Sequence, residues 1–288
     1  MWNHICQQIS QTTAIPFLLK DQRSLSGGCI NQTYQLIGQQ NQSYFIKINQ
    51  ASSFSMFVAE ALGLSRMSST KTIRVPKPIC WGTVSNSSYL VLEWLEFSPR
   101  GNHQAWEIMG KQLAAMHQTR GSEKFGWEEN NTIGSTPQIN TWTSNWADFF
   151  AQHRIGYQLK LAKRRGGDFP DTDRVVAQVK SQLHERQPHP SLVHGDLWSG
   201  NAGILESGEP VILDPATYYG DHEVDVAMTE LFGGFPPAFY QGYEQVCPLD
   251  PGYQKRKPLY NLYHILNHFN LFGGGYGAQA SRMLAQIL

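Results

Sequence analysis

The sequence predicts an α+β fold of two unequal lobes, in which a small antiparallel β-sheet lobe with one helix precedes a larger, mainly helical lobe. Three observations support this class. Strand-like runs dominate up to residue 95, helical periodicity dominates from 96 onward, and a cluster of reactive residues falls between short apolar runs late in the chain. We therefore expect two domains, 1–95 and 96–288.

Length and composition allow this architecture and exclude some classes of function. A chain of 288 residues can bury a substantial core. Lys and Arg number 23, as do Asp and Glu, so no net field favours nucleic acid or a membrane as a partner. The polar start, MWNHICQQIS, does not resemble a signal peptide. The four cysteines form no CxxC and no metal-ligand spacing. We expect a cytoplasmic protein with reduced thiols, as a monomer or weak homodimer.

The first lobe is expected to contain four strands and one helix. Residues 34–37 and 43–48 predict two strands joined by a polar turn. Apolar residues recur at three-to-four spacing from Phe54 to Met67, which predicts a helix. Two more strands are expected around 79–84 and 89–95.

The second lobe is expected to be mainly helical. Helical patterns cover 104–118, 146–163 and 173–183. Between the first two of these lies a stretch rich in Trp, Asn, Thr and Gly, residues 121–145, which we expect to be an ordered loop with its own function.

The stretch LVHGDLWSGN, residues 192–201, carries the main chemical signal. Asp196 and Asn201 are five residues apart, and VILD ends in a second carboxylate at Asp214. Phosphoryl transfer from ATP requires a group that accepts the alcohol's proton and oxygen ligands that hold Mg²⁺. Asp196 is predicted to be the catalytic base, and Asn201 and Asp214 the metal ligands. The protein-kinase catalytic loop uses the same Asp-to-Asn interval.

Upstream residues match the other requirements of such a site. Lys47 lies inside a predicted strand, where its ammonium can reach the α- and β-phosphates, and Glu60 on the next helix can orient it. Gly27 and Gly28 form a turn whose backbone N–H groups can approach phosphates, although the turn is not a GxGxxG motif.

Two further features are expected to support the site. Glu93, Trp94 and Leu95 end the last strand of the first lobe, where a hinge would offer backbone hydrogen bonds to adenine. Asp225 follows on an apparent helix and is predicted to hold the catalytic loop by accepting backbone N–H bonds.

The chain resembles the fructosamine kinase (ketosamine 3-kinase) family, within the aminoglycoside phosphotransferase and choline kinase-like group of protein-kinase-like folds. The resemblance covers nearly the whole length, and Trp198-Ser199 inside the catalytic loop is its most discriminating part. It implies ATP-dependent phosphorylation of the sugar 3-hydroxyl of ketosamines, after which the product decomposes and releases the amine. The segments that carry it are GGCIN (27–31), FVAEALGL (57–64), VPKPICWG (75–82), HGDLWSGN (194–201), LDPATYYGDHEVDVAMTELFGGF (213–235) and NLFGGGYG (270–277).

A ketosamine offers hydroxyls and a protonatable amine, so its pocket should present aromatic faces and carboxylates. The side chains expected to supply them are Trp198, Tyr218, Asp221 and Glu223. Cys29, directly after the glycine turn, is either a small packing residue or a redox-sensitive thiol whose pKa nearby N–H groups lower.

Two other classes of function stay open at this level. A related kinase for choline, an aminoglycoside or homoserine would need much the same site, and a catalytically inactive binding module would keep the fold. The intact Lys47, Glu60, Asp196, Asn201 and Asp214 speak against the inactive module. The sequence separates neither free from protein-bound amines nor fructosamine from ribulosamine or erythrulosamine.

Overall fold

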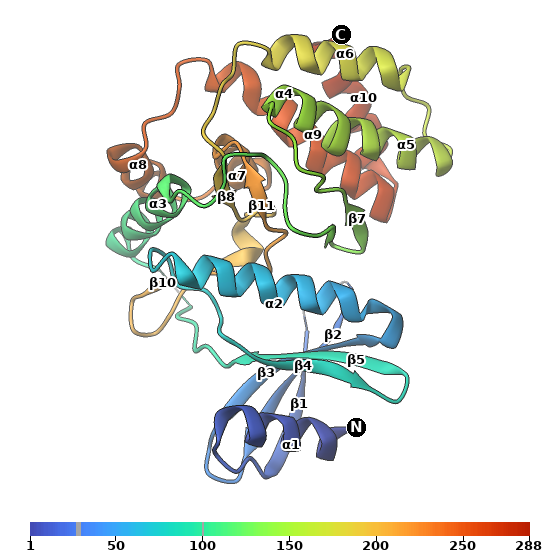
Figure 1. Cartoon of the computed structure of the whole chain (residues 1–288). Helices are drawn as coiled ribbons and strands as arrows, with labels where there is room; N and C mark the ends of the chain where they lie inside the picture. Colours follow the sequence, from blue (N-terminus) through green and yellow to red (C-terminus); the bar gives the residue numbers. More distant parts are fainter. Residues whose placement is uncertain (27–29, 100) are drawn as a thin grey trace.

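The computed structural model of the chain describes residues 1–26, 30–99 and 101–288. Its first lobe is built on a five-stranded antiparallel sheet with the strand order β1-β2-β3-β5-β4 (Figure 1). The strands are β1 (Leu19–Leu25), β2 (Gln32–Gly38), β3 (Ser43–Gln50), β4 (Pro78–Val84) and β5 (Ser87–Glu93).

Two helices cover opposite faces of this sheet. Helix α1 (Trp2–Thr13) lies on the outer face, and α2 (Phe54–Ser69) lies between the sheet and the second lobe (Figure 1). Because successive side chains of a strand point to opposite faces of the sheet, β5 contributes side chains to the core on each face. Tyr89 and Val91 join the small core under α1, whereas Leu90 and Leu92 join the main core that α2 shares with the helical lobe.

The sequence reasoning missed α1 and β1. In α1 only Ile5, Cys6 and Ile9 are buried, so its apolar stripe is narrow. The edge strand β1 is exposed along most of its length, which leaves little apolar alternation to recognise. The four predicted strands and the helix from Phe54 are present with ends shifted by a few residues.

The second lobe is mainly helical, as expected. Trp146 begins a continuous helical stretch that includes a π-helical segment, Phe150–Gly156, between α4 and α5. The helices are α3 (His103–Gln118), α4 (Trp146–Phe149), α5 (Tyr157–Arg164), α6 (Thr172–Leu183), α7 (Glu223–Leu231), α8 (Pro237–Val246), α9 (Tyr253–Phe272) and α10 (Gly275–Ile287).

Three pairs of short strands lie beside these helices and lead into the chemically interesting loops. Strand β8 (Ser191–Val193) pairs with β11 (Tyr218–Gly220), and β9 (Ala202–Ile204) pairs with β10 (Pro210–Ile212). The stretch 121–145 contains a hairpin, β6 (Asn131–Ile133) and β7 (Thr136–Gln138). The loop after β8 and the residues after β10 meet, because the N–H of Leu213 donates to the backbone oxygen of Asn201 at 3.0 Å.

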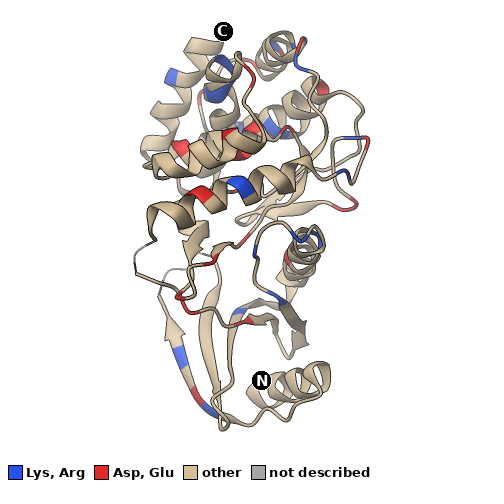
Figure 2. Cartoon of the chain, turned by 90° about the vertical axis from the view of Figure 1, so that its left-hand side faces the viewer, with Lys and Arg blue, Asp and Glu red and all other residues tan. Residues whose placement is uncertain are grey.

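Charge is distributed over the molecule without a face of one sign in the view of Figure 2. Blue and red segments alternate along the helices of the second lobe and on the sheet. Within the described ranges, no helix combines the length and the apolar character needed to cross a membrane.

Candidate active site

A cleft of about 870 Å³ lies between the sheet and the helical lobe. Both lobes and the connection between them contribute to its walls. Most of the residues expected from the sequence line it, namely Lys47, Glu60, Glu93, Trp94, Leu95, Asp196, Trp198, Asn201 and Asp214.

Lys47 links the two lobes across the cleft. Its Nζ lies 2.8 Å from Glu60 Oε1 on α2 and 2.5 Å from Asp214 Oδ1 of the helical lobe. Burial opposes the charge on Lys47, but the carboxylates of Asp214 and Glu60 raise its pKa above its ordinary value. The ammonium therefore stays charged and points from a rigid strand into the cleft.

The predicted catalytic loop, which follows β8, is hydrogen-bonded to a side chain of α7. Asp225 Oδ2 accepts the backbone N–H of His194 (2.6 Å), and Oδ1 accepts that of Gly195 (2.8 Å). Its Oδ2 also lies 3.0 Å from His117 Nε2. Burial alone would raise the pKa of Asp225. Its hydrogen-bond partners, of which His117 has the largest effect, hold the pKa below its usual value. Asp225 thus accepts two backbone N–H bonds from this loop, and its anchoring role stays a prediction.

Glycine is required in this loop for a steric reason. Gly195 has a φ of +81°, and a Cβ there would lie 2.2 Å from the carbonyl oxygen of Ala216. The backbone of the HGD segment therefore packs directly against the residues that follow Asp214.

Asp196 lies at the floor of the cleft with its carboxylate partly exposed. Asn201 Nδ2 donates to the backbone oxygen of Asp196 at 2.9 Å and approaches Oδ2 only at 3.4 Å. Burial, followed by repulsion from Asp214 and Asp225, raises the pKa of Asp196 to about 7. A carboxylate in this range can take a proton from an alcohol during its transfer.

Asn201 and Asp214 suit a hard divalent cation. The amide nitrogen of Asn201 is used by Asp196, so its oxygen remains for a ligand. Asp214 has a left-handed φ of +58° and a side chain that is 53% exposed, which presents the carboxylate to the cleft. The described residues contain no group of three or more His, Cys, Asp and Glu placed to hold a metal. A cation here would complete its shell with water and phosphate oxygens, as Mg²⁺ commonly does.

The connection between the lobes is only partly available to a nucleotide. The N–H of Glu93 donates to Lys77 O at 3.0 Å, and the Glu93 carboxylate is bonded by Arg74 at 2.6 Å. Glu93 is therefore held by the protein itself. Among the described residues, none accepts a hydrogen bond from the N–H of Leu95, so this group is available to adenine.

Three residues expected in the acceptor pocket lie elsewhere, and this expectation is wrong. Tyr218 is 1% exposed. The Arg154 guanidinium lies over its ring, with Arg154 Cζ 4.0 Å from the centroid of the Tyr218 ring. Asp221 and Glu223 are each fully buried in ion pairs, with Arg186 at 2.8 Å and Arg256 at 2.7 Å respectively. They stabilise the helical lobe and do not line the cleft.

Two walls of the cleft were missed by the sequence reasoning. One is the hairpin β6–β7, through residues 131–134. The other is aromatic and comes from the end of α9 and the start of α10, where the His268 ring lies 5.0 Å from the Tyr276 ring. The motif NLFGGGYG marks this second wall, and Trp198 faces the same space from the catalytic loop.

Gly27, Gly28 and Cys29 lie outside the described residues, whereas Ser26 and Ile30 on either side line the cleft. The suggestion of a redox-sensitive Cys29 therefore stays a prediction.

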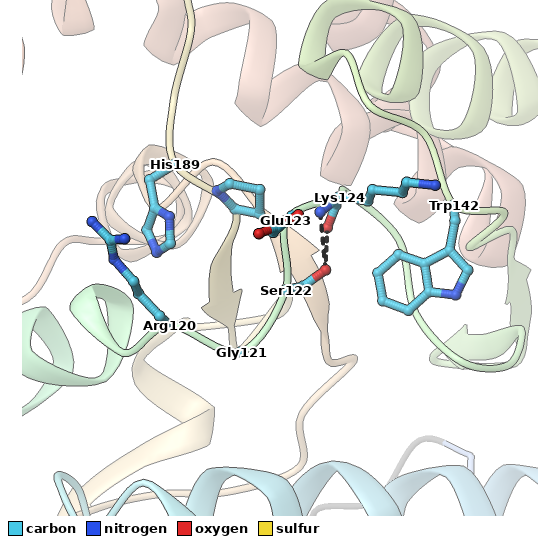
Figure 3. A pocket seen from close by; sticks show the side chains of 8 residues that line it. Arg120, Gly121, Ser122, Glu123, Lys124, Trp142 and His189 are labelled. Carbon is cyan, nitrogen blue, oxygen red and sulfur yellow. Dashed lines mark hydrogen bonds between the residues drawn. The ribbon is translucent and has the colours of Figure 1, made fainter.

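A second hollow, also about 870 Å³, lies on the helical lobe. Figure 3 shows Arg120 beside His189 on one side of it and Lys124 near Trp142 on the other. It contains none of the residues that point to phosphoryl transfer, so the first cleft is the candidate active site.

The sequence matches the fructosamine kinase family over residues 1–288. A probable ketoamine kinase of Synechocystis sp. is 66% identical over 287 residues, covering 100% of this chain and 97% of the relative. A chloroplastic protein-ribulosamine 3-kinase of Arabidopsis thaliana is 45% identical over 272 residues, with 92% and 82% of the two chains covered.

Solved structures agree with this placement. A protein of Haemophilus somnus 129PT assigned as a fructosamine-3-kinase superposes with a TM-score of 0.95 at 34% identity, covering 100% of this chain and 98% of that one. An aminoglycoside phosphotransferase shares the fold alone, with a TM-score of 0.64 at 18% identity and 98% and 97% of the two chains covered. The chain belongs to the fructosamine kinase family.

Proposed function

We propose that this protein transfers the γ-phosphoryl group of ATP to the 3-hydroxyl of a ketosamine. Family membership supports the reaction class and the substrate class. In this proposal residues 1–95 form the nucleotide-binding lobe and residues 96–288 form the catalytic and substrate-binding lobe. The enzyme would act in the cytoplasm as a monomer or weak homodimer.

The nucleotide would be held mainly by the first lobe. Lys47, oriented by Glu60 at 2.8 Å, would neutralise charge on the α- and β-phosphates. Backbone groups at Trp94 and Leu95 would meet adenine. Gly27 and Gly28, outside the described residues, are expected from the sequence to bring backbone N–H groups close to the phosphates. Asn201 and Asp214 would hold Mg²⁺, which supplies charge neutralisation for the transferred group.

Asp196 would supply the proton chemistry. As a carboxylate in the cleft, it accepts the proton of the sugar 3-hydroxyl while that oxygen attacks the γ-phosphorus and ADP leaves. Asp225 fixes the loop that carries it, through two backbone N–H bonds. The 3-phosphate would then decompose and release the amine, which amounts to deglycation.

The acceptor would lie between the catalytic loop and the aromatic wall. Trp198 is 38% exposed and offers an apolar face to the sugar carbons. Glycated small amines and glycated proteins are both candidate substrates. The observation that carries the proposal is the meeting of Asp196, Lys47 and Asp214 in one cleft.

The test has two parts. Wild-type enzyme is assayed for ATP consumption with fructosamines, ribulosamines and erythrulosamines, free and protein-bound, alongside choline, homoserine and an aminoglycoside. We expect turnover with ketosamines only. Preference for one of the other alcohols would favour a related small-molecule kinase.

The second part is Asp196→Asn. It should bind Mg-ATP as tightly as wild type, yet its transfer rate should fall about 100- to 10,000-fold because the general base is lost. A rate within about threefold of wild type would remove Asp196 from the base role.

A further inference from the structure

One buried histidine faces the catalytic base without a hydrogen-bond partner. His264, on α9, is 3% exposed, and its Nδ1 lies 4.0 Å from Asp196 Oδ1. Among the described residues, nothing bonds to this Nδ1. An unsatisfied buried nitrogen lowers stability, so such groups in native proteins call for a reason.

The carboxylate opposite is also poorly bonded. The single side-chain donor near it in the described part of the chain is Asn201 Nδ2, at 3.4 Å from Oδ2. Oδ1 has no donor there. Two groups of complementary type thus face each other at a separation slightly too long for a hydrogen bond. Catalytic hydrogen bonds are often long in an empty site and tighten when the substrates are bound.

We propose that His264 is a positioning residue for Asp196: its Nδ1–H donates to Asp196 Oδ1 in the substrate-bound site and aims Oδ2 at the acceptor hydroxyl. The inference rests on the proposed role of Asp196 as the base.

The surroundings of His264 fit a neutral donor. Burial, reinforced by His268 and Arg154, lowers the pKa of His264 to about 3. A neutral imidazole orients the carboxylate without adding a positive charge that would weaken it as a base. The ring packs edge-to-face against Tyr263, with centroids 5.1 Å apart, which restrains its rotation.

Three substitutions separate positioning from packing. Asn places an amide nitrogen near the Nδ1 position, Gln places it near Nε2, and Phe keeps a ring without a donor. His264→Phe and His264→Gln should lower kcat about 10- to 100-fold, the effect of losing one hydrogen bond to a charged group. His264→Asn should keep kcat within about threefold of wild type. The KM for ATP should stay unchanged in all three.

A matched control lies one helical turn away. Tyr260 is also buried on α9, and its hydroxyl donates to Asp221 rather than to the cleft. Tyr260→Phe should lower the melting temperature without lowering kcat. In the Asp196→Asn background, His264→Phe should cause no further loss of the single-turnover rate, because its effect passes through the carboxylate.

Several outcomes would overturn the inference. One is an equal kcat for His264→Asn and His264→Gln. Another is a further fall in the single-turnover rate when His264→Phe is added to Asp196→Asn. These results differ from failure of the proposed function, which would appear as full activity of Asp196→Asn itself.

Discussion

Lys47, Glu60 and Asp214 form a charged triad with one positive and two negative side chains. Asp196 lies close enough for Asp214 to raise its pKa. The cleft therefore holds more negative than positive charge before any ligand binds. In the proposed function, a divalent cation beside Asp214 would relieve this imbalance and let Asp196 ionise more readily. The mutually repulsive carboxylates would therefore suit the metal-bound phosphate of the proposed function.

This arrangement predicts different effects at the two proposed metal ligands, Asn201 and Asp214. Asp214→Ala should abolish the Mg²⁺-dependent gain in ATP affinity, since it removes a full charge and the partner of Lys47. Asn201→Ala should weaken that gain less, because an amide contributes only a dipole. Calorimetric titration of ATP with and without Mg²⁺ measures both. If Asp214→Ala bound Mg-ATP as tightly as wild type, the metal site would have to lie elsewhere.

At the scale of the element, α7 holds the catalytic loop through the carboxylate of Asp225. In Asp225→Asn one oxygen becomes an NH₂ group, which cannot accept the N–H of His194 or Gly195. The unpaired N–H should cost about 1–3 kcal/mol of stability. The loop should also lose its fixed position, so we expect kcat to fall more than the affinity for ATP.

Thermal unfolding and steady-state kinetics check this prediction. Thr229→Val, one turn later on α7, serves as the control because Thr229 Oγ1 donates to Val226 O and Tyr240 rather than to the loop. An Asp225→Asn enzyme with wild-type kcat would show that the loop keeps its shape without this anchor.

The residues that these elements carry differ in how far the sequence could predict their place in the site. Lys47, Glu60, Asp196 and Asp214 were predictable because phosphoryl transfer demands fixed residue types at characteristic spacings. Asp221 was misplaced because its partner, Arg186, is 35 residues away, and no local pattern shows that the pair closes inside the lobe. His264 gave no signal either, since its importance comes from facing Asp196 across the fold.

At the scale of the whole molecule, the two lobes are tied together by contacts distant in sequence. Arg74 of the first lobe forms an isolated bridge with Val211 of the second. Arg66 on α2 reaches Glu128 at 2.5 Å. These contacts join residues far apart in the sequence, so the relative placement of the lobes follows from packing that no single segment encodes. The sequence predicted two lobes, but their mutual orientation required the structure.

The stability of the whole molecule should depend on pH through histidines withdrawn from solvent, of which the partly buried His222 gives the clearest test. Its Nδ1 lies 2.8 Å from the hydroxyl of Tyr243, and burial lowers its pKa to about 4. The unfolded chain takes up a proton near an ordinary pKa of about 6.5, whereas the folded protein does not. Between these two values the unfolded state binds more protons, so stability falls as the pH falls.

From pH 8 to pH 5, wild type should therefore lose about 2 kcal/mol more unfolding free energy than His222→Asn, which keeps a polar group facing Tyr243 but has no proton to gain. Asp196 and Glu60, whose pKa values are raised to about 7, act in the opposite direction, but they are present in both proteins and cancel in the difference. Urea unfolding of both proteins at pH 8 and pH 5 measures this difference in unfolding free energy. Equal losses in the two proteins would mean that His222 is protonated in the folded state, and that its burial does not keep it neutral.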